Sequence, residues 1–159
     1  MGFAFFFFVA WLVIAGFTLM KKRLTLVENT VLLLLILIIN IHWSWIIFEE
    51  LKLIKISKQP VNYTAFLIQR SVTIPLIVVI TMNLMRQSAS RLRTLLMASL
   101  SVLLLEAFVL IGRYFGITRA VRWHMIYDVA YFALLHVIAY YFLKYFQHSG
   151  QGRSEAERA

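Results

Sequence analysis

The chain has 159 residues, of which 62% are hydrophobic and 15% aromatic, a composition far more apolar than that of a soluble domain. It contains no cysteine, which excludes disulfides, thiolate nucleophiles, iron–sulfur clusters and cysteine-based zinc sites. The formal net charge is +9, but lysine and arginine gather at helix ends in membrane proteins, so we expect no nucleic-acid partner. Charged residues lie between long apolar runs, which predicts an all-α, polytopic integral membrane protein with five transmembrane helices.

The first predicted helix covers residues 3–20. Its sequence, FAFFFFVAWLVIAGFTLM, holds nothing more polar than Thr18, and the basic run at residues 21–23 follows it. The segment lacks both a basic leader and a small-residue cleavage site. We therefore expect a retained membrane helix and not a cleaved signal peptide.

The second predicted helix covers residues 29–48, and Trp43 and Trp45 near its end indicate a membrane–water interface. The next segment, residues 49–63, mixes lysines with apolar residues in the sequence EELKLIKISKQPVNY. We predict a short amphipathic helix there, or a protruding end of the second helix, that stops before Pro60. The alternative is a solvated loop.

The third predicted helix, residues 64–85, contains Arg70 and Pro75. Proline has no N–H and clashes with the carbonyl four residues before it, so we predict a kink that releases the carbonyl of Ser71. The following connection, residues 86–93, is short. It predicts an antiparallel hairpin of the third and fourth helices.

The fourth predicted helix, residues 94–112, carries Glu106, and the fifth, residues 125–143, carries Asp128 and His136. A charge in hydrocarbon costs at least about 2.5 to 3.5 kcal/mol on insertion scales. Such residues therefore indicate either packing partners inside the bundle or a functional site.

A single five-helix domain, residues 1–145, accounts for all the apolar runs, and the polar residues 146–159 are predicted to form a disordered tail. The side of the first and third connections and the C-terminal tail carries nine lysines and arginines, three in each segment. The other side, with the second and fourth connections and the near end of the third helix, carries seven. This bias predicts an outside N-terminus and a cytoplasmic C-terminus. The run HWSWIIFEELKLIKIS and the tyrosine-rich last helix are similar in texture to multi-pass proteins of Gram-positive bacteria, so we expect a bacterial cytoplasmic membrane.

The depth of each ionisable residue follows from the alternating directions of the helices. His42, Arg70 and Glu106 each lie six residues from the helix end on one face, which places them about 9 Å deep at 1.5 Å per residue. Asp128 lies about 4 to 5 Å deep on the same face. We predict that Glu106 pairs with Arg70 and that His42 and Asp128 lie nearby.

Three interpretations of this polar cluster stay open. In the first, it is a buried ion pair that only fixes helix register. In the second, it is a site that binds an ion, a polar head group or a proton. In the third, the residues do not meet, because Arg70 extends to the membrane interface. For His136 we expect a hydrogen bond to a neighbouring helix, with a proton relay as the alternative. His124 and Asp128 share a helix face, but two ligands do not make a metal site, so we predict none.

The sequence contains no catalytic motif of the types GxSxG, HExxH or GxGxxG, and no phosphate-binding glycine loop. The leading hypothesis is a non-enzymatic accessory or lipid-interacting component without a cofactor, whose partners are the bilayer and a membrane protein or a second copy. Its contact surfaces would be the first helix and the basic segment 49–63. The alternatives are an oligomeric transporter or channel subunit that uses Arg70, Glu106 and His42, and an intramembrane lipid-modifying enzyme.

Overall fold

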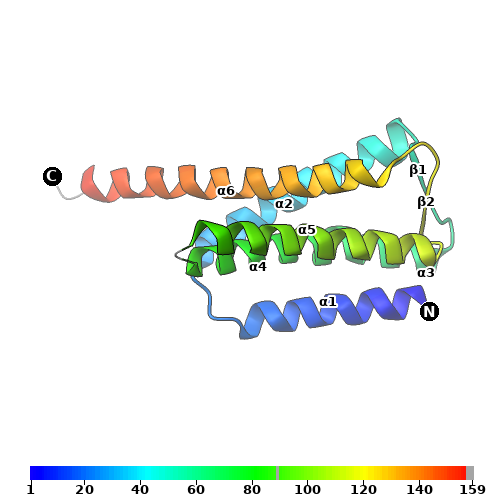
Figure 1. Ribbon diagram of the computed structural model, residues 1–159, viewed down its shortest axis with the longest axis horizontal. Coiled ribbons are helices and arrows are strands. Elements are labelled where there is room, and N and C mark those ends of the chain that lie inside the picture. Colours follow the sequence, from blue (N-terminus) through cyan, green and yellow to red (C-terminus); the bar gives the residue numbers. More distant parts are fainter. Residues whose placement is uncertain (89, 157–159) are drawn as a thin grey trace.

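The computed structural model describes residues 1–88 and 90–156, and side chains as far as residue 148 (Figure 1). In this part of the chain five helical segments are long and apolar enough to cross a membrane, which confirms the predicted all-α class and number of long helices. Three are single helices, α1 (Gly2–Leu19), α5 (Arg91–Tyr114) and α6 (Met125–Ala156). Two contain a π-helical segment, α2 (Leu26–Trp45) with η1 (Ile46–Glu50), and α3 (Pro60–Ile68) with η2 (Gln69–Thr73) and α4 (Ile74–Gln87).

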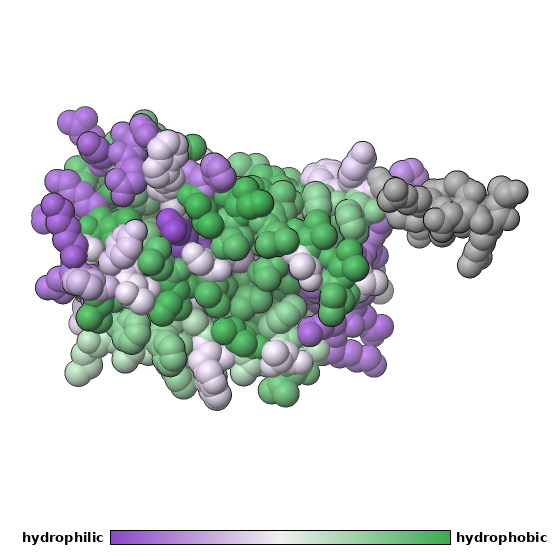
Figure 2. All heavy atoms as spheres, turned by 180° about the vertical axis from the view of Figure 1, so that it is seen from behind, coloured by the Kyte–Doolittle hydropathy of each residue, from purple (hydrophilic) through white to green (hydrophobic). Residues whose placement is uncertain are grey.

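The α4–α5 hairpin lies in the middle of the bundle, with α1 on one side and α2 and α6 on the other (Figure 1). α4 ends at Gln87 and α5 begins at Arg91, and the two helices pack against each other, in agreement with the predicted antiparallel arrangement. The main core is formed where α2, α4, α5 and α6 meet, around the fully buried Leu32, Val78 and Leu105. In Figure 2 apolar residues form a belt between two hydrophilic ends.

A capping box begins α2. The Thr25 side chain accepts a hydrogen bond from the backbone N–H of Glu28, and the Glu28 carboxylate accepts one from the N–H of Thr25. In front of this cap, the Asn83 side-chain oxygen accepts hydrogen bonds from the N–H groups of Arg23 and Leu24, at 3.0 and 3.1 Å. The α1–α2 connection is thereby attached to α4.

The segment after α2 agrees with the prediction only at its start. η1 prolongs α2 as far as Glu50, which is the predicted protruding end of the second helix. No separate amphipathic helix covers residues 51–59, where a strand, β1 (Ile54–Ile56), forms instead. β1 pairs antiparallel with β2 (Thr118–Ala120), with Lys55 opposite Arg119. The strand forms because its partner comes from the distant connection between α5 and α6, which the local lysine pattern does not reveal.

Gly116 turns the chain from α5 into β2. It has a φ of 68°, and its N–H bonds the carbonyl of Arg113 while the N–H of Ile117 bonds the carbonyl of Gly112. These two bonds form a Schellman motif, in which glycine takes up the left-handed conformation without strain. The cap ends α5 directly after Arg113 and Tyr114 and directs β2 across the end of the bundle.

The last helix is longer than the predicted span. α6 runs to Ala156, past residue 145, where the sequence predicts the end of the domain. Residues 157–159 of the predicted tail lie outside the described residues.

Candidate functional site

A cavity of about 70 Å³ lies between α2, η2, α5 and α6, beneath the two strands. Because one probe sphere of about 10 to 15 Å³ is enough to hold a water molecule, the cavity has room for several waters or one small polar group. Its charged lining residues are two arginines and one aspartate, Arg70, Arg113 and Asp128. Most of the remaining wall is apolar or aromatic, including Trp43, Phe48, Phe66, Trp123, Tyr131 and Phe132.

Pro75 shapes the η2 side of the cavity. Where the sequence predicts a kink, the helix has a π-helical segment, in which the N–H of Ile74 bonds the carbonyl of Gln69. In this pattern the carbonyl of Arg70 would bond the N–H of residue 75, but proline has none. The carbonyl that gains a side-chain partner is therefore that of Arg70, and not that of Ser71 as predicted.

Asn40 is that side-chain partner. Its amide nitrogen donates to the carbonyl of Arg70 at 2.5 Å, and its amide oxygen accepts from the hydroxyl of Tyr131 at 2.9 Å. Asn40 and Tyr131 are both buried. One asparagine of α2 thus joins the interrupted helix to α6 along the cavity wall.

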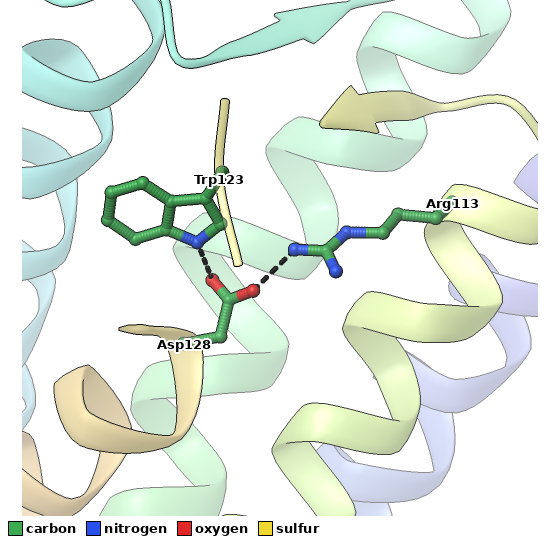
Figure 3. Close-up of polar contacts among 3 residues, drawn as sticks. All are labelled: Arg113, Trp123 and Asp128. Carbon is green, nitrogen blue, oxygen red and sulfur yellow. Dashed lines mark hydrogen bonds and ion pairs between the residues drawn. The ribbon is translucent and has the colours of Figure 1, made fainter. Parts of the chain in front are cut away.

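A second set of hydrogen bonds at the cavity is centred on the carboxylate of Asp128, which accepts from Arg113 and Trp123 (Figure 3). Arg113 donates from a guanidinium nitrogen to one carboxylate oxygen, and the indole N–H of Trp123 donates to the other at 2.9 Å. This is the sole ion pair in the described part of the chain. Each oxygen of Asp128 thus accepts one hydrogen bond, and its charge is balanced by Arg113.

The predicted pair of Glu106 with Arg70 is not formed. Both carboxylate oxygens of Glu106 are buried without a hydrogen-bond partner among the described residues, and Glu106 is 3% exposed. The ion pair that the described residues form is that of Arg113 with Asp128, and it includes neither Glu106 nor Arg70. Arg113 pairs with the other acid because α5 extends past residue 112, which brings Arg113 over the first turn of α6.

Arg70 lies at the cavity without an acidic partner among the described residues. Its guanidinium carbon is 5.4 Å from the centre of the Phe66 ring, a cation–π distance. Its Nε is buried and unbonded. Arg70 is therefore a half-buried cation for which the described residues supply no anion.

The three other predicted residues lie apart from this cavity. His42 is exposed, and its Nδ1 bonds the carbonyl of Ile38 on its own helix, because Asn40 and Ser44 occupy the inward face of α2. His124 is also exposed, although Asp128 one turn later is buried. Among the described residues no group of three histidine, aspartate or glutamate side chains is placed to hold a metal.

His136 is buried and contacts a neighbouring helix, as its sequence position suggests. Its Nδ1 lies 2.8 Å from the carbonyl of Phe132 and its Nε2 lies 2.9 Å from the hydroxyl of Ser101 on α5. A carbonyl only accepts, so Nδ1 carries a proton, and in the neutral ring Nε2 accepts from Ser101.

Sequence reasoning missed Arg113, Trp123 and Tyr131 as members of the site. One signal was available for Arg113: Asp128 is predicted just inside the same face of the membrane, and Arg113 directly follows the predicted end of the fourth helix. The contacts of Trp123 and Tyr131 depend on how the helices are rotated, which the sequence pattern does not give.

Comparisons of the chain with protein-family models, with curated proteins and with solved structures give no match. The proposals below therefore rest on the geometry of the chain itself.

Proposed function

We propose that this protein is a non-enzymatic, lipid-binding component of a bacterial cytoplasmic membrane, and that its cavity holds the anionic head group of a membrane lipid. The observation that carries the proposal is Arg70, a half-buried cation at the cavity without an acidic partner among the described residues. A guanidinium out of water is costly unless it is paired. A phosphate group supplies both the charge and the acceptor oxygens that match its fork of donors.

The division of charge within the cavity favours an anion as the ligand. Arg113 is already balanced by Asp128, so the two arginines and one aspartate leave one positive charge, that of Arg70. The carboxylate of Asp128 bonds Arg113 and Trp123 and forms no ion pair with Arg70.

Aromatic rings beside this charge favour an amphiphile over a free ion. Trp43 stacks on Tyr131 with ring centres 4.6 Å apart and an angle of 4° between the planes, and Trp123 meets Trp43 edge to face. Such rings suit the boundary between head groups and acyl chains, where tryptophan and tyrosine are enriched. A lipid offers the apolar chain for this wall and the phosphate for Arg70.

The proposed placement in the membrane has two supports. The apolar belt between hydrophilic ends in Figure 2 matches a chain that crosses a bilayer. The side of the α1–α2 and α4–α5 connections, counted with the C-terminal segment, has more lysines and arginines, nine against seven, which favours a cytoplasmic position for that side. The N-terminus, the two strands and the cavity would then lie toward the outer face.

The test is lipid retention by the purified protein. Wild type, Arg70→Gln and the control Arg119→Gln, which changes an exposed arginine of β2, are exchanged into micelles containing phosphatidylglycerol or phosphatidylcholine. Bound lipid is counted by native mass spectrometry. We expect wild type and control to retain phosphatidylglycerol in preference, and Arg70→Gln to lose about 10- to 100-fold in affinity, the equivalent of one charge-assisted contact.

Equal retention of phosphatidylglycerol by Arg70→Gln and wild type would overturn the proposal. Arg70→Lys adds a second comparison, because it keeps the charge and loses the fork of donors; it is expected to bind with intermediate affinity. Unfolding temperatures of all variants show whether any loss of lipid is a loss of fold.

A further inference from the structure

The polar group that the lipid cavity does not use is Glu106. We propose that Glu106 is a proton-binding site in the interior of the bundle, loaded from water in the cavity. The inference does not rest on lipid binding. It rests on the burial of the carboxyl group and on the absence of a hydrogen-bond partner for either of its oxygens among the described residues.

The surroundings of Glu106 favour its neutral form. On α5 the nearest charge along the same face is Arg113, seven residues or about 10 Å further on, and that charge is held by Asp128 of α6. On η2, Arg70 stacks on Phe66. With no donor and no counter-ion of its own, a carboxylate would bear the full cost of desolvation, which a proton removes.

Apart from Asp128 of α6, which is paired with Arg113, the described residues of α1, α2 and α6 bring no acidic side chain to the level of Glu106. The sequence of α1 contains no titratable side chain. On α2, His42 faces outward, and on α6 both ring nitrogens of His136 have other partners, the carbonyl of Phe132 and the hydroxyl of Ser101. Asp128 differs from Glu106 in having two hydrogen-bond donors, Arg113 and Trp123, so of the two the carboxyl group that lacks donors among the described residues is that of Glu106.

One uncharged oxygen lies at a similar level of the bundle but does not bond Glu106. The Thr73 hydroxyl of η2 is also buried without a partner among the described residues. Gln69 lies opposite Gly112, its side-chain oxygen 3.6 Å from where a Cβ of that glycine would stand. In an antiparallel hairpin the residue four positions after Gln69 is then level with about residue 108, close to the level of Glu106.

The route to the site is short. Val109 lines the cavity and lies three residues, or about 4.5 Å along α5, from Glu106. Glu106 therefore lies below the cavity floor, within reach of a proton carried by cavity water. The proton returns to that water when the carboxyl ionises, so no other reactant is needed.

Carbodiimide labelling tests the proposal. The apolar reagent dicyclohexylcarbodiimide is attacked by a carboxyl group that delivers its proton to the reagent, and the adduct rearranges to a stable N-acylurea on the side chain. Wild-type protein is treated in mildly acidic and in alkaline buffer, digested and mapped by mass spectrometry. We expect an adduct on Glu106 that falls several-fold in alkaline buffer, and no adduct at this position in Glu106→Gln. Arg70→Gln should keep the adduct, which separates this result from the lipid test.

If the carbodiimide does not reach Glu106, an infrared difference spectrum tests whether its carboxyl group is protonated. Wild type minus Glu106→Gln should contain the carbonyl stretch of a protonated carboxylic acid, and Glu106→Asp should retain such a band. The Glu106→Gln protein should keep its fold, since an amide has the size and neutrality of the protonated acid. Absence of the protonated-acid band, or an adduct that is equal in acid and alkali, would overturn the proposal.

Discussion

The bridge made by Asn40 leads to the sharpest prediction on stability. Asn40→Leu keeps the volume of the side chain but removes the bonds to the Arg70 carbonyl and the Tyr131 hydroxyl. A buried polar group without a partner costs about 1 to 3 kcal/mol, whereas single polar contacts between membrane helices average about 0.6 kcal/mol and reach about 1.7. Asn40→Leu removes two such contacts, one of them to a backbone carbonyl with no other donor. We therefore expect its free energy of unfolding to fall by about 2 kcal/mol.

Pro75 provides the test of that reasoning. The Arg70 carbonyl needs Asn40 because residue 75 has no N–H, so Pro75→Ala should supply a backbone donor and reduce the cost of Asn40→Leu to about 1 kcal/mol. The matched control is Pro60→Ala. Pro60 is the first residue of α3, where a missing N–H costs nothing, and the cost of Asn40→Leu should stay unchanged in that background.

The free energy of unfolding is measured for each member of the cycle by titration with sodium dodecyl sulfate in mixed micelles, followed by circular dichroism. An interaction energy of about 1 kcal/mol between Asn40 and Pro75, and none between Asn40 and Pro60, is expected. If Asn40→Leu costs the same with proline or alanine at position 75, the carbonyl of Arg70 is not orphaned by the proline and the reasoning fails.

The remaining predictions use the same unfolding assay. Gly116→Ala should destabilise the protein by about 1 to 2 kcal/mol, because Gly116 has a positive φ. Gly16→Ala should stabilise it by about 0.5 to 1 kcal/mol, because Gly16 lies in a helix with open space around it. Effects of the same sign would contradict the left-handed cap at Gly116. Asp128→Asn weakens a pair that is only partly buried, so we expect a loss of about 2 kcal/mol, and a neutral effect would show that the pair is dispensable. Arg70→Gln and Glu106→Gln should add within about 0.5 kcal/mol, and a coupling above 1 kcal/mol would show that they pair after all.

The sequence predicts how deep each ionisable residue of the candidate site lies along its helix. Counting residues from the helix ends predicts one layer for His42, Arg70 and Glu106. Depth does not determine which way a side chain faces around its helix. His42 faces outward because its neighbours two positions before and after it fill the inward face of α2, and Glu106 lies below the cavity with no partner among the described residues.

The sequence by itself determined the five long helices, the hairpin of α4 and α5 and the disturbance at Pro75. Each of these depends on local properties: the length of an apolar run, the length of a connection, and the missing N–H of one residue. Only the tertiary structure decided that β1 pairs with β2, that Arg113 and not Arg70 meets an acid, and that Asn40 serves the carbonyl of Arg70. Together with the bond from Tyr131 to Asn40, these contacts join residues that are between 15 and 91 positions apart. They depend on the rotation and tilt of packed helices, which no local sequence pattern encodes.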